Sequence, residues 1–318
     1  MNKILCIGEA LIDMICTDKG SSLSDGDHFL KKAGGAPTNV AAAIAALGGN
    51  VDIVTKVGKD PFGTHIVEVL KSFGISTDTI TIDPLHFTTF AFVSLMENGE
   101  RDFYFNRGAD GLLTREDVAH VDMTSYAISH FGSATAFLPG PLQSTYEYML
   151  AQAKYHHHFI SFDPNYRELL FGDKKEEFIK RSTSFIQQCN FFKVSDEEAF
   201  LITGQSNIQD AAANFARLSK AIFAITLGKE GTLIGMNGAT SMIPSIPIHP
   251  IDTTGAGDAF VGAVLYQLSK YSVQEINTLD IHSWINIFSN ANKAGARTCE
   301  YMGAMEAFKH LSNDIFNS

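Results

Sequence analysis

The sequence predicts an α/β protein in which helices cover both faces of a central, mostly parallel sheet. Short apolar runs of strand length alternate with helix-like segments along almost the whole chain, which is typical of parallel sheets. The chain has 318 residues and shows neither an internal repeat nor a Pro/Ser-rich linker. We therefore expect a single domain over residues 1–318.

The strands are expected at apolar, β-rich runs: 3–7, 51–57, 79–82, 126–131, 159–162, 191–194, 221–227, 231–236 and 240–248. Amphipathic or small-residue runs predict helices at 41–47, 62–73, 141–155, the segment that ends at Gly204, 211–218, 259–269 and 277–298. Glycines follow the helical run 41–47 at once, as expected of a helix stop.

Residues 86–108 interrupt this alternation. Two β-rich runs, 88–95 and 101–105, flank Asn98-Gly99, which is a strong hairpin signal. A hairpin that carries aromatic residues such as Phe103 is suited to cover a small ligand or to pair with a second copy of the chain as a homodimer. We expect a lid formed by roughly 14–32 and 86–108.

Composition and charge exclude several classes of protein. The net charge of −11 argues against a nucleic-acid or anionic-membrane partner, and no apolar run is long enough for a membrane span. Glu9 and Asp13 interrupt the first apolar run, which argues against a signal peptide. The four cysteines are scattered without a CxxC pair, so we expect a reducing, cytoplasmic setting.

The stretch 251–260, Ile-Asp-Thr-Thr-Gly-Ala-Gly-Asp-Ala-Phe, carries the strongest chemical signal. Gly255 and Gly257 let the backbone approach a ligand, and the free N–H groups of the following helix start favour an anion. Asp258 within that pocket is suited to take a proton from a hydroxyl while the N–H groups hold a phosphoryl group. The alternative for an acid at this position is a simple helix cap.

Polar residues follow several other predicted strands, at Asp13, Asn165, Arg167 and Glu198. The carboxyl ends of parallel strands meet at one edge of a sheet, where open α/β sheets bind ligands. Gly34 and Gly35 would let a polyol lie against bare backbone, with Asn39 offering both a donor and an acceptor. Each residue alone is equally compatible with a turn or with close helix–sheet packing.

Together these residues resemble the PfkB (ribokinase-like) family of sugar kinases over essentially the whole chain. Gly34-Gly35-Ala36-Pro37-Thr38-Asn39-Val40-Ala41 is similar to the first family signature, and Asp252-Thr253-Thr254-Gly255-Ala256-Gly257-Asp258 to the second, more specific one. The resemblance implies a ribokinase-like three-layer fold with a small β lid. It also implies ATP-dependent phosphorylation of a primary hydroxyl, with Asp258 as general base and the N–H groups from Gly255 through Ala256 and Gly257 to Asp258 as anion hole. Asp13, Gly34, Gly35 and Asn39 would hold the sugar.

The resemblance also implies where ATP and metal ions bind. The nucleotide side would comprise Thr226, Gly228, Gly231, Asn292 beside the adenine, and Lys193. The carbonyls of Asp252 and Thr254 correspond to an optional K⁺ site. Mg²⁺ would be linked through water to Glu198, but Ser195 stands where the family motif has Asn, which puts a metal role of Ser195 in doubt.

The sequence leaves the substrate open. No Walker A motif and no GxGxxG after the first strand are present, which argues against a P-loop NTPase and a dinucleotide oxidoreductase. The motifs around Asp13, Gly34 and Lys193 look most like fructokinases, whereas Asp163-Pro164-Asn165-Tyr166-Arg167 is shared with 2-keto-3-deoxygluconate kinases. Arg167 and Arg107 are suited to either a neutral hydroxyl or a sugar-acid carboxylate. A non-catalytic sugar or nucleotide sensor on a kinase scaffold is the alternative from another class.

Overall fold

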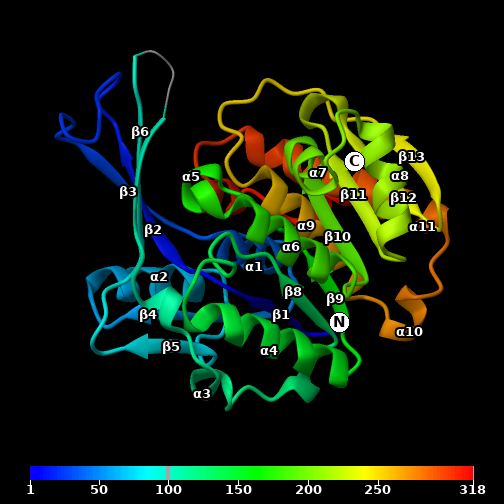
Figure 1. Cartoon of the computed structure of the whole chain (residues 1–318), viewed down its shortest axis with the longest axis horizontal. Coiled ribbons are helices and arrows are strands. Elements are labelled where there is room, and N and C mark those ends of the chain that lie inside the picture. The colour runs from blue at the N-terminus through cyan, green and yellow to red at the C-terminus, as the bar shows by residue number, and fades with distance from the viewer. Residues whose placement is uncertain (98–100, 318) are drawn as a thin grey trace.

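The computed structural model describes residues 1–97 and 101–317 and has a nine-stranded sheet with helices on both faces (Figure 1). The strand order is β13-β12-β11-β10-β9-β8-β1-β4-β5, and all neighbours are parallel except β11–β12 and β12–β13. The strands are β1 (Ile4–Ile7), β4 (Val51–Gly58), β5 (Ile80–Asp83), β8 (Ile128–Phe131), β9 (Phe159–Phe162), β10 (Phe191–Ser195), β11 (Ile222–Thr226), β12 (Thr232–Met236) and β13 (Ala239–Ile243).

Strand β1 shows how the sheet separates two cores. Its side chains point alternately to opposite faces, so Ile4 and Cys6 join one apolar cluster while Leu5 and Ile7 join the other. The first cluster is covered by α1 (Ala36–Ala46), α2 (Pro61–Ser72), α9 (Ala256–Leu268), α10 (Val273–Ile276), α11 (Ile281–Cys299) and α12 (Ala304–Phe308). The second is covered by α3 (Arg115–Val118), α4 (Pro141–Tyr155), α5 (Glu168–Phe171), α6 (Lys175–Ile186), α7 (Asp196–Thr203) and α8 (Ile208–Leu218). Within the described part of the chain, no helix has the length and apolar character needed to cross a membrane.

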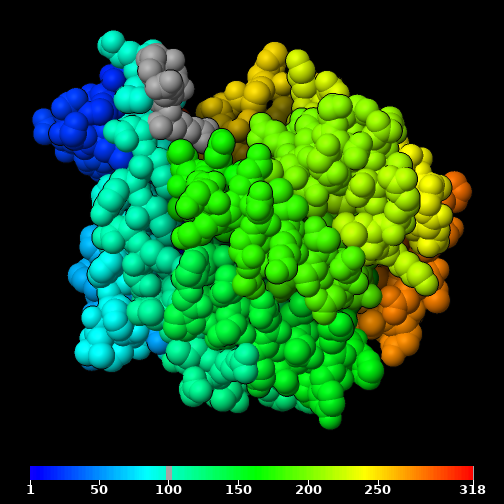
Figure 2. Space-filling model, in the orientation of Figure 1, coloured from blue at the N-terminus to red at the C-terminus, as the bar shows by residue number. Residues whose placement is uncertain are grey.

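A second sheet of four strands, here called the small sheet, projects from the body of the molecule (Figure 2). Its order is β3-β2-β6-β7, with β2 (Leu11–Cys16), β3 (Phe29–Gly34), β6 (Phe90–Leu95) and β7 (Arg101–Asn106). Strands β6 and β7 are antiparallel neighbours, which confirms the expected hairpin, whereas the turn residues Asn98 and Gly99 lie outside the described residues. The chain thus crosses from the main sheet into the small sheet directly after β1 and again after β5.

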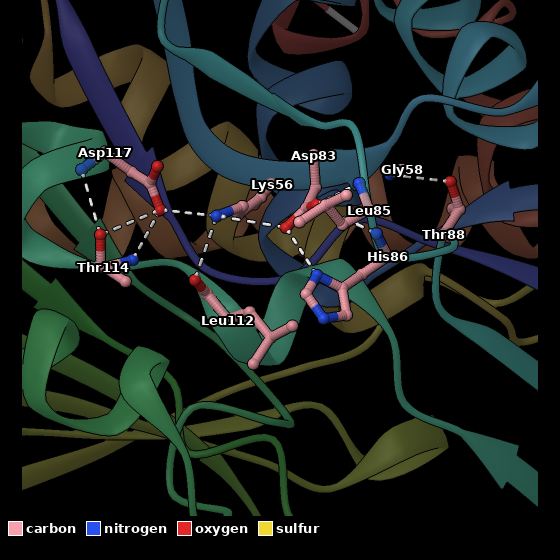
Figure 3. Close-up of polar contacts among 9 residues, drawn as sticks. All are labelled: Lys56, Gly58, Asp83, Leu85, His86, Thr88, Leu112, Thr114 and Asp117. Atoms are coloured by element: carbon pink, nitrogen blue, oxygen red, sulfur yellow. Dashed lines mark hydrogen bonds and ion pairs between the residues drawn. The ribbon is translucent and has the colours of Figure 1, made fainter.

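The second of these crossings is fixed by a partly buried ion cluster (Figure 3). The Lys56 ammonium lies 3.4 Å from an Asp83 carboxylate oxygen and 2.9 Å from one of Asp117. Asp83 also accepts the N–H groups of Leu85 and His86 at 2.8 and 3.0 Å. These contacts tie the segment that leads into β6 to both β4 and the start of α3.

Several of the expected boundaries were wrong; the helix expected at 41–47, for example, is α1, which already begins at Ala36. The expected strand 240–248 ends at Ile243, because the prolines at 244 and 247 remove ladder donors. The expected helix 277–298 is α11, which begins after the N-cap Asp280 and follows the separate short helix α10. The expected strand 126–131 begins only at Ile128. Asp13 does not lie in a turn after β1, because the chain re-enters a strand at Leu11.

Candidate active site

The start of α9 forms a cluster of unpaired backbone donors. Gly255 is the N-cap residue in the left-handed region (φ 82°), and a Cβ added there would lie 2.5 Å from Ala304 Cβ. Among the described residues no acceptor is found for the N–H groups of Gly255, Gly257 and Asp258, whereas the N–H of Ala256 donates to the Thr253 carbonyl at 3.2 Å. The cluster can therefore bind an anion at a helix N-terminus through three donors rather than the four expected.

Asp258 lies in the first turn of α9 and meets α1 across the interface of the two helices. The Asn39 amide donates to the Asp258 carboxylate at 2.8 Å, joining two residues 219 positions apart in sequence. Burial raises the pKa of Asp258 above its ordinary value, although Asn39, Arg167 and Lys193 oppose the rise. A buried carboxylate with only one hydrogen-bond donor retains the lone pairs that a general base needs.

Asp13 extends the site onto the small sheet. A Cβ at Gly34 would collide with the Asp13 carboxylate, so the glycine leaves the room that this carboxylate occupies. Burial raises the pKa of Asp13 to about 6, and the charge of Arg167 opposes the rise. Arg167, the N-cap residue of α5, thus acts electrostatically on both Asp13 and Asp258. These three residues lie in one region of the molecule, together with Asn39 and Gly34.

An ion pair lies beneath the first turn of α9. The Lys193 ammonium is 3.2 Å from an Asp163 carboxylate oxygen, and a Cβ at Gly257 would lie 3.1 Å from this ammonium. Burial alone would lower the pKa of Lys193, but Asp163, Glu198 and Asp258 raise it above its ordinary value. Lys193 therefore stays positively charged beside the anion-binding turn, which suits the phosphate side of the site.

Asn165 is oriented by backbone contacts on the strand end beside Asp163. Its φ is 48°, a conformation that Asn tolerates better than most residues, and its amide donates to the Gly132 carbonyl at 2.9 Å. The side chain is buried, and its contacts fix the loop between β9 and α5 that ends in Arg167.

The residues expected on the nucleotide side lie between β11 and α11. Thr226 ends β11, and Gly228 and Gly231 bound the turn to β12. Asn292 on α11 accepts a hydrogen bond from Thr232 at 2.8 Å and donates to the Pro244 carbonyl at 3.1 Å. Asn292 thus links α11 to β12 and to the segment that follows β13.

Glu198 and Asp252 were expected near metal ions, and their carboxylates are engaged by the protein. Glu198 closes a capping box at the start of α7, accepting the N–H groups of Ser195 and Tyr166 at 2.8 Å each. Asp252 accepts from Thr254 and, at 2.8 Å, from the Gly303 N–H. Glu198 therefore suits a metal held through water, because each carboxylate oxygen keeps a lone pair.

The described residues contain no cluster of three or more His, Cys, Asp or Glu side chains that would hold a metal without a ligand's help. The carbonyls of Asp252 and Thr254 accept no backbone hydrogen bond within this part of the chain, so they fit a monovalent cation.

Two further residues expected at the substrate, Arg107 and Phe103, make contacts with other parts of the protein. The Arg107 guanidinium donates to the carbonyls of Pro139 and Thr135 at 2.8 and 3.0 Å and lies 3.7 Å from Asp110. Phe103 on β7 stacks on Phe105 with ring centroids 6.3 Å apart. Arg107 therefore fastens the end of β7 to the loop after β8.

Glu9 is a buried residue that the sequence reasoning missed as part of the site. It is 1% exposed, and its carboxylate accepts the N–H groups of Ala36 at 3.0 Å and Ala134 at 3.3 Å, together with the Ser133 hydroxyl. Burial and the nearby Asp110 outweigh these donors and raise the pKa of Glu9 to about 7. The one available signal was an acid directly after a buried strand and before an apolar run.

A cavity of about 650 Å³ lies elsewhere, at the amino ends of β9, β10 and β11. It is lined by residues such as Asn190, Arg217 and Lys220. It shares no residue with the cluster around Asp258, which stands at the opposite, carboxyl edge of the sheet.

Comparisons with known proteins identify the family of this chain. Residues 1–310 match the model of the pfkB family of carbohydrate kinases. The chain belongs to this family. It is 35% identical to a probable fructokinase-4 of Arabidopsis thaliana over 96% of this chain and 93% of the relative. The expectation that the chain is a carbohydrate kinase is therefore confirmed.

Two solved pfkB-type structures are similar over nearly their whole length. A fructokinase from Xylella fastidiosa with bound ATP has a TM-score of 0.86 at 27% identity and covers 99% of this chain and 97% of its own. A fructokinase double mutant from Vibrio cholerae O395, bound to fructose, ADP and potassium, has a TM-score of 0.85 at 28% identity and covers 100% and 97%. The expected ribokinase-like α/β fold is confirmed.

Proposed function

We propose that this pfkB-family kinase transfers the γ-phosphoryl group of ATP to the primary hydroxyl of fructose, giving fructose 6-phosphate, with Asp258 as general base. The observation that carries the proposal is the position of Asp258. Its carboxylate is held by Asn39 at 2.8 Å and stands among the unpaired N–H groups at the start of α9. A base and an anion hole in one helical turn are what phosphoryl transfer to a hydroxyl requires.

The sugar is held opposite Asp258 by the small-sheet side of the site. Asp13 accepts hydrogen bonds from hydroxyl groups of the sugar. Gly34 leaves the room that the Asp13 carboxylate occupies, and Gly35 carries no side chain that would collide with the Glu9 carbonyl. Asp258 then takes the proton from the attacking hydroxyl, and the N–H groups of Gly255 and Gly257 stabilise charge on the transferring group. Lys193, held by Asp163, adds positive charge beside the phosphates.

ATP lies along Thr226, Gly228, Gly231 and Asn292 in this proposal. Mg²⁺ would be reached through water from Glu198, and it would supply positive charge that balances the phosphates. The carbonyls of Asp252 and Thr254 would hold K⁺, as the potassium bound to the Vibrio cholerae fructokinase suggests. The free thiols of the four cysteines are compatible with a cytoplasmic setting.

The small sheet serves as a lid in this proposal, with a homodimer contact as its second use. Apolar Ile15 and Leu30 are partners across β2 and β3 and are 38% and 40% exposed, on the same face as Asp13. An apolar sheet face can be buried against sugar and core or against a second small sheet. Sedimentation equilibrium of the chain and of Leu30→Lys should show a dimer for the former and a monomer for the latter. A monomeric wild type would reject the homodimer.

A second acceptor, 2-keto-3-deoxygluconate, is favoured by the position of Arg167. Among the described residues its guanidinium makes one hydrogen bond, to the carbonyl of Tyr166, and it lies near Asp13 and Asp258. An Arg beside the sugar can pair bidentately with a sugar-acid carboxylate. Fructose carries no charge for it to recognise.

The decisive experiment is an ADP-release assay with fructose, 2-keto-3-deoxygluconate and ribose, compared by kcat/KM. We expect fructose to give the highest kcat/KM and Arg167→Ala to lower it less than about tenfold, because the lost bond is to a neutral hydroxyl. A preference for 2-keto-3-deoxygluconate that Arg167→Ala abolishes would assign the alternative. No ADP release with any sugar would point to a sensor.

The role of Asp258 is tested by Asp258→Asn, which keeps the side-chain shape and removes the base. We expect kcat to fall by about 10² or more while the melting temperature is retained. Wild-type kcat in a folded Asp258→Asn enzyme would show that another group accepts the proton.

A further inference from the structure

Glu9 stands where three segments of the site meet. It lies in the short connection between β1 and β2, so the chain passes from Glu9 directly into the strand that carries Asp13. Its carboxylate reaches the first residue of α1, Ala36, and the loop after β8 at Ser133 and Ala134. One side chain thus joins the small sheet, the sugar-side glycines before α1, and the main sheet.

The backbone carbonyl of Glu9 also contacts the start of α1. Its carbonyl accepts the Thr38 hydroxyl at 2.9 Å, and a Cβ at Gly35 would lie 2.5 Å from that carbonyl oxygen. Gly35 has φ 106°, a conformation that a residue with a side chain rarely adopts. The peptide of Gly35 is therefore pressed against Glu9, two residues from Pro37 and four from Asn39, which holds Asp258.

The Ser133 hydroxyl is held in one orientation by backbone groups of its own loop. The Ser133 hydroxyl oxygen accepts the N–H groups of Thr135 at 3.2 Å and Ala136 at 2.9 Å, so its proton is directed to Glu9. The described part of the chain offers no basic side chain as an ion-pair partner for Glu9. A fully buried carboxylate held only by neutral donors is costly, which makes a purely stabilising role a poor explanation.

We propose that Glu9 is a positioning residue that holds the start of α1 and the loop after β8 in one geometry, so that the acceptor hydroxyl of the sugar lies in reach of Asp258. The proposal rests on the proposed sugar-kinase function and names the residue that sets the sugar side of that site. Glu9 touches no reacting atom; it acts through Ala36 and Ser133. A displacement of about 1 Å on the sugar side is enough to slow phosphoryl transfer severely.

The test compares Glu9→Ala and Glu9→Gln with Asp83→Asn as the matched control. Asp83 is also buried and also fixes a crossing into the small sheet, but its partners are Lys56, Leu85 and His86 (Figure 3), none of which belongs to the proposed sugar side. Steady-state kcat and KM for ATP and for the sugar with the highest kcat/KM in the panel are measured for each folded variant, together with its melting temperature.

We expect Glu9→Ala to lower kcat/KM for the sugar at least about tenfold, because the acceptor hydroxyl is misplaced, while the ATP KM changes less than about twofold. Glu9→Gln should recover much of the loss, because its amide oxygen can still accept the Ala36 and Ala134 N–H groups. Asp83→Asn should lower the melting temperature with both KM values unchanged.

The proposal is overturned if the folded Glu9→Ala enzyme keeps the wild-type kcat/KM for the sugar, or if the ATP KM rises by as much as kcat/KM for the sugar falls. If Glu9→Ala does not fold, Ser133→Ala decides by the same criterion, because it removes the hydroxyl donor that links Glu9 to the loop after β8. Failure here is distinct from failure of the kinase proposal, which shows as ADP release unaffected by Asp258→Asn.

Discussion

Two pairs of aspartates, Asp60 with Asp83 and Asp13 with Asp258, differ in how many hydrogen-bond donors their carboxylates have. Asp60 and Asp83, at the crossing into β6, are each held by several donors: Asp60 by the N–H groups of Phe62, Gly63 and Thr88 and by the Thr88 hydroxyl. Asp258 has one donor, Asn39, and no hydrogen-bond donor to the Asp13 carboxylate is found among the described residues. The first pair is structurally saturated and the second is left open.

The pKa values follow this difference. Burial acts to raise the pKa of Asp83, but the Leu85 and His86 N–H groups, the His86 ring and Lys56 lower it to about 2. For Asp13 the same burial meets only the charge of Arg167, and the pKa rises to about 6. These carboxylates are thus distinguished by their donors: those with few or no donors are available to a substrate.

The largest effect should come from removing the open carboxylate of Asp13. We expect Asp13→Asn to lower kcat/KM for the sugar by about 10²–10³. The neutral amide accepts hydrogen bonds from the sugar hydroxyls more weakly than the charged carboxylate does. Asp60→Asn, the matched change in the saturated group, should leave kcat/KM of the folded enzyme unchanged. Equal losses in the two variants would remove the distinction drawn between them.

Next in size is the loss of Lys56, which supports only the saturated group (Figure 3). Lys56→Met leaves Asp83 and Asp117 close together without their cation, so the free energy of unfolding should fall by about 2 kcal/mol. Urea unfolding measures this loss, and kcat should stay at its wild-type value. A fall in kcat with unchanged stability would mean that the cluster acts on the site.

Gly257→Ala should separate activity from stability in the opposite sense. Gly257 lies within α9, where Ala is a better helix former than Gly, so stability should hold or rise. The new methyl group would stand 3.1 Å from the Lys193 ammonium and crowd the anion-binding turn, so we expect kcat to fall by about tenfold. Unchanged kcat would show that phosphate does not approach this turn.

The sequence was sufficient to predict features that depend on residues close together in the chain. The alternation of strands and helices, the hairpin around residue 98 and the donors at Gly255–Asp258 each depend on neighbouring residues. Asn39 and Asp258 were found separately through their motifs, and only the fold shows that they are bonded.

Other features depend on which donors the fold brings near, and residue type does not reveal this. Glu9 lies 124 positions from Ser133, so no local sequence pattern predicts their contact. Arg107 and Glu198 have the residue types expected at a site, yet backbone groups take up the hydrogen bonds of both. Sequence patterns thus predicted which residues are polar at the strand ends, but not which of them are saturated.

The smallest effect should appear in the pH dependence of stability, again with opposite signs in the two groups. Asp13 has a folded pKa raised from 3.8 to about 6, so its favourable contribution to folding is complete below pH 3.8 and is lost as the pH rises through 6. Asp83, with a folded pKa lowered to about 2, contributes above pH 3.8 and loses that contribution as the pH falls toward 2. Asp13→Asn should therefore raise the free energy of unfolding at pH 7.5 by about 1 kcal/mol, although it weakens sugar binding. Asp83→Asn should lower the free energy of unfolding at the same pH. Urea denaturation at pH 5 and pH 7.5 measures both. A gain for Asp13→Asn that is the same at the two pH values would show that its carboxylate is not held in an unfavourable charged state.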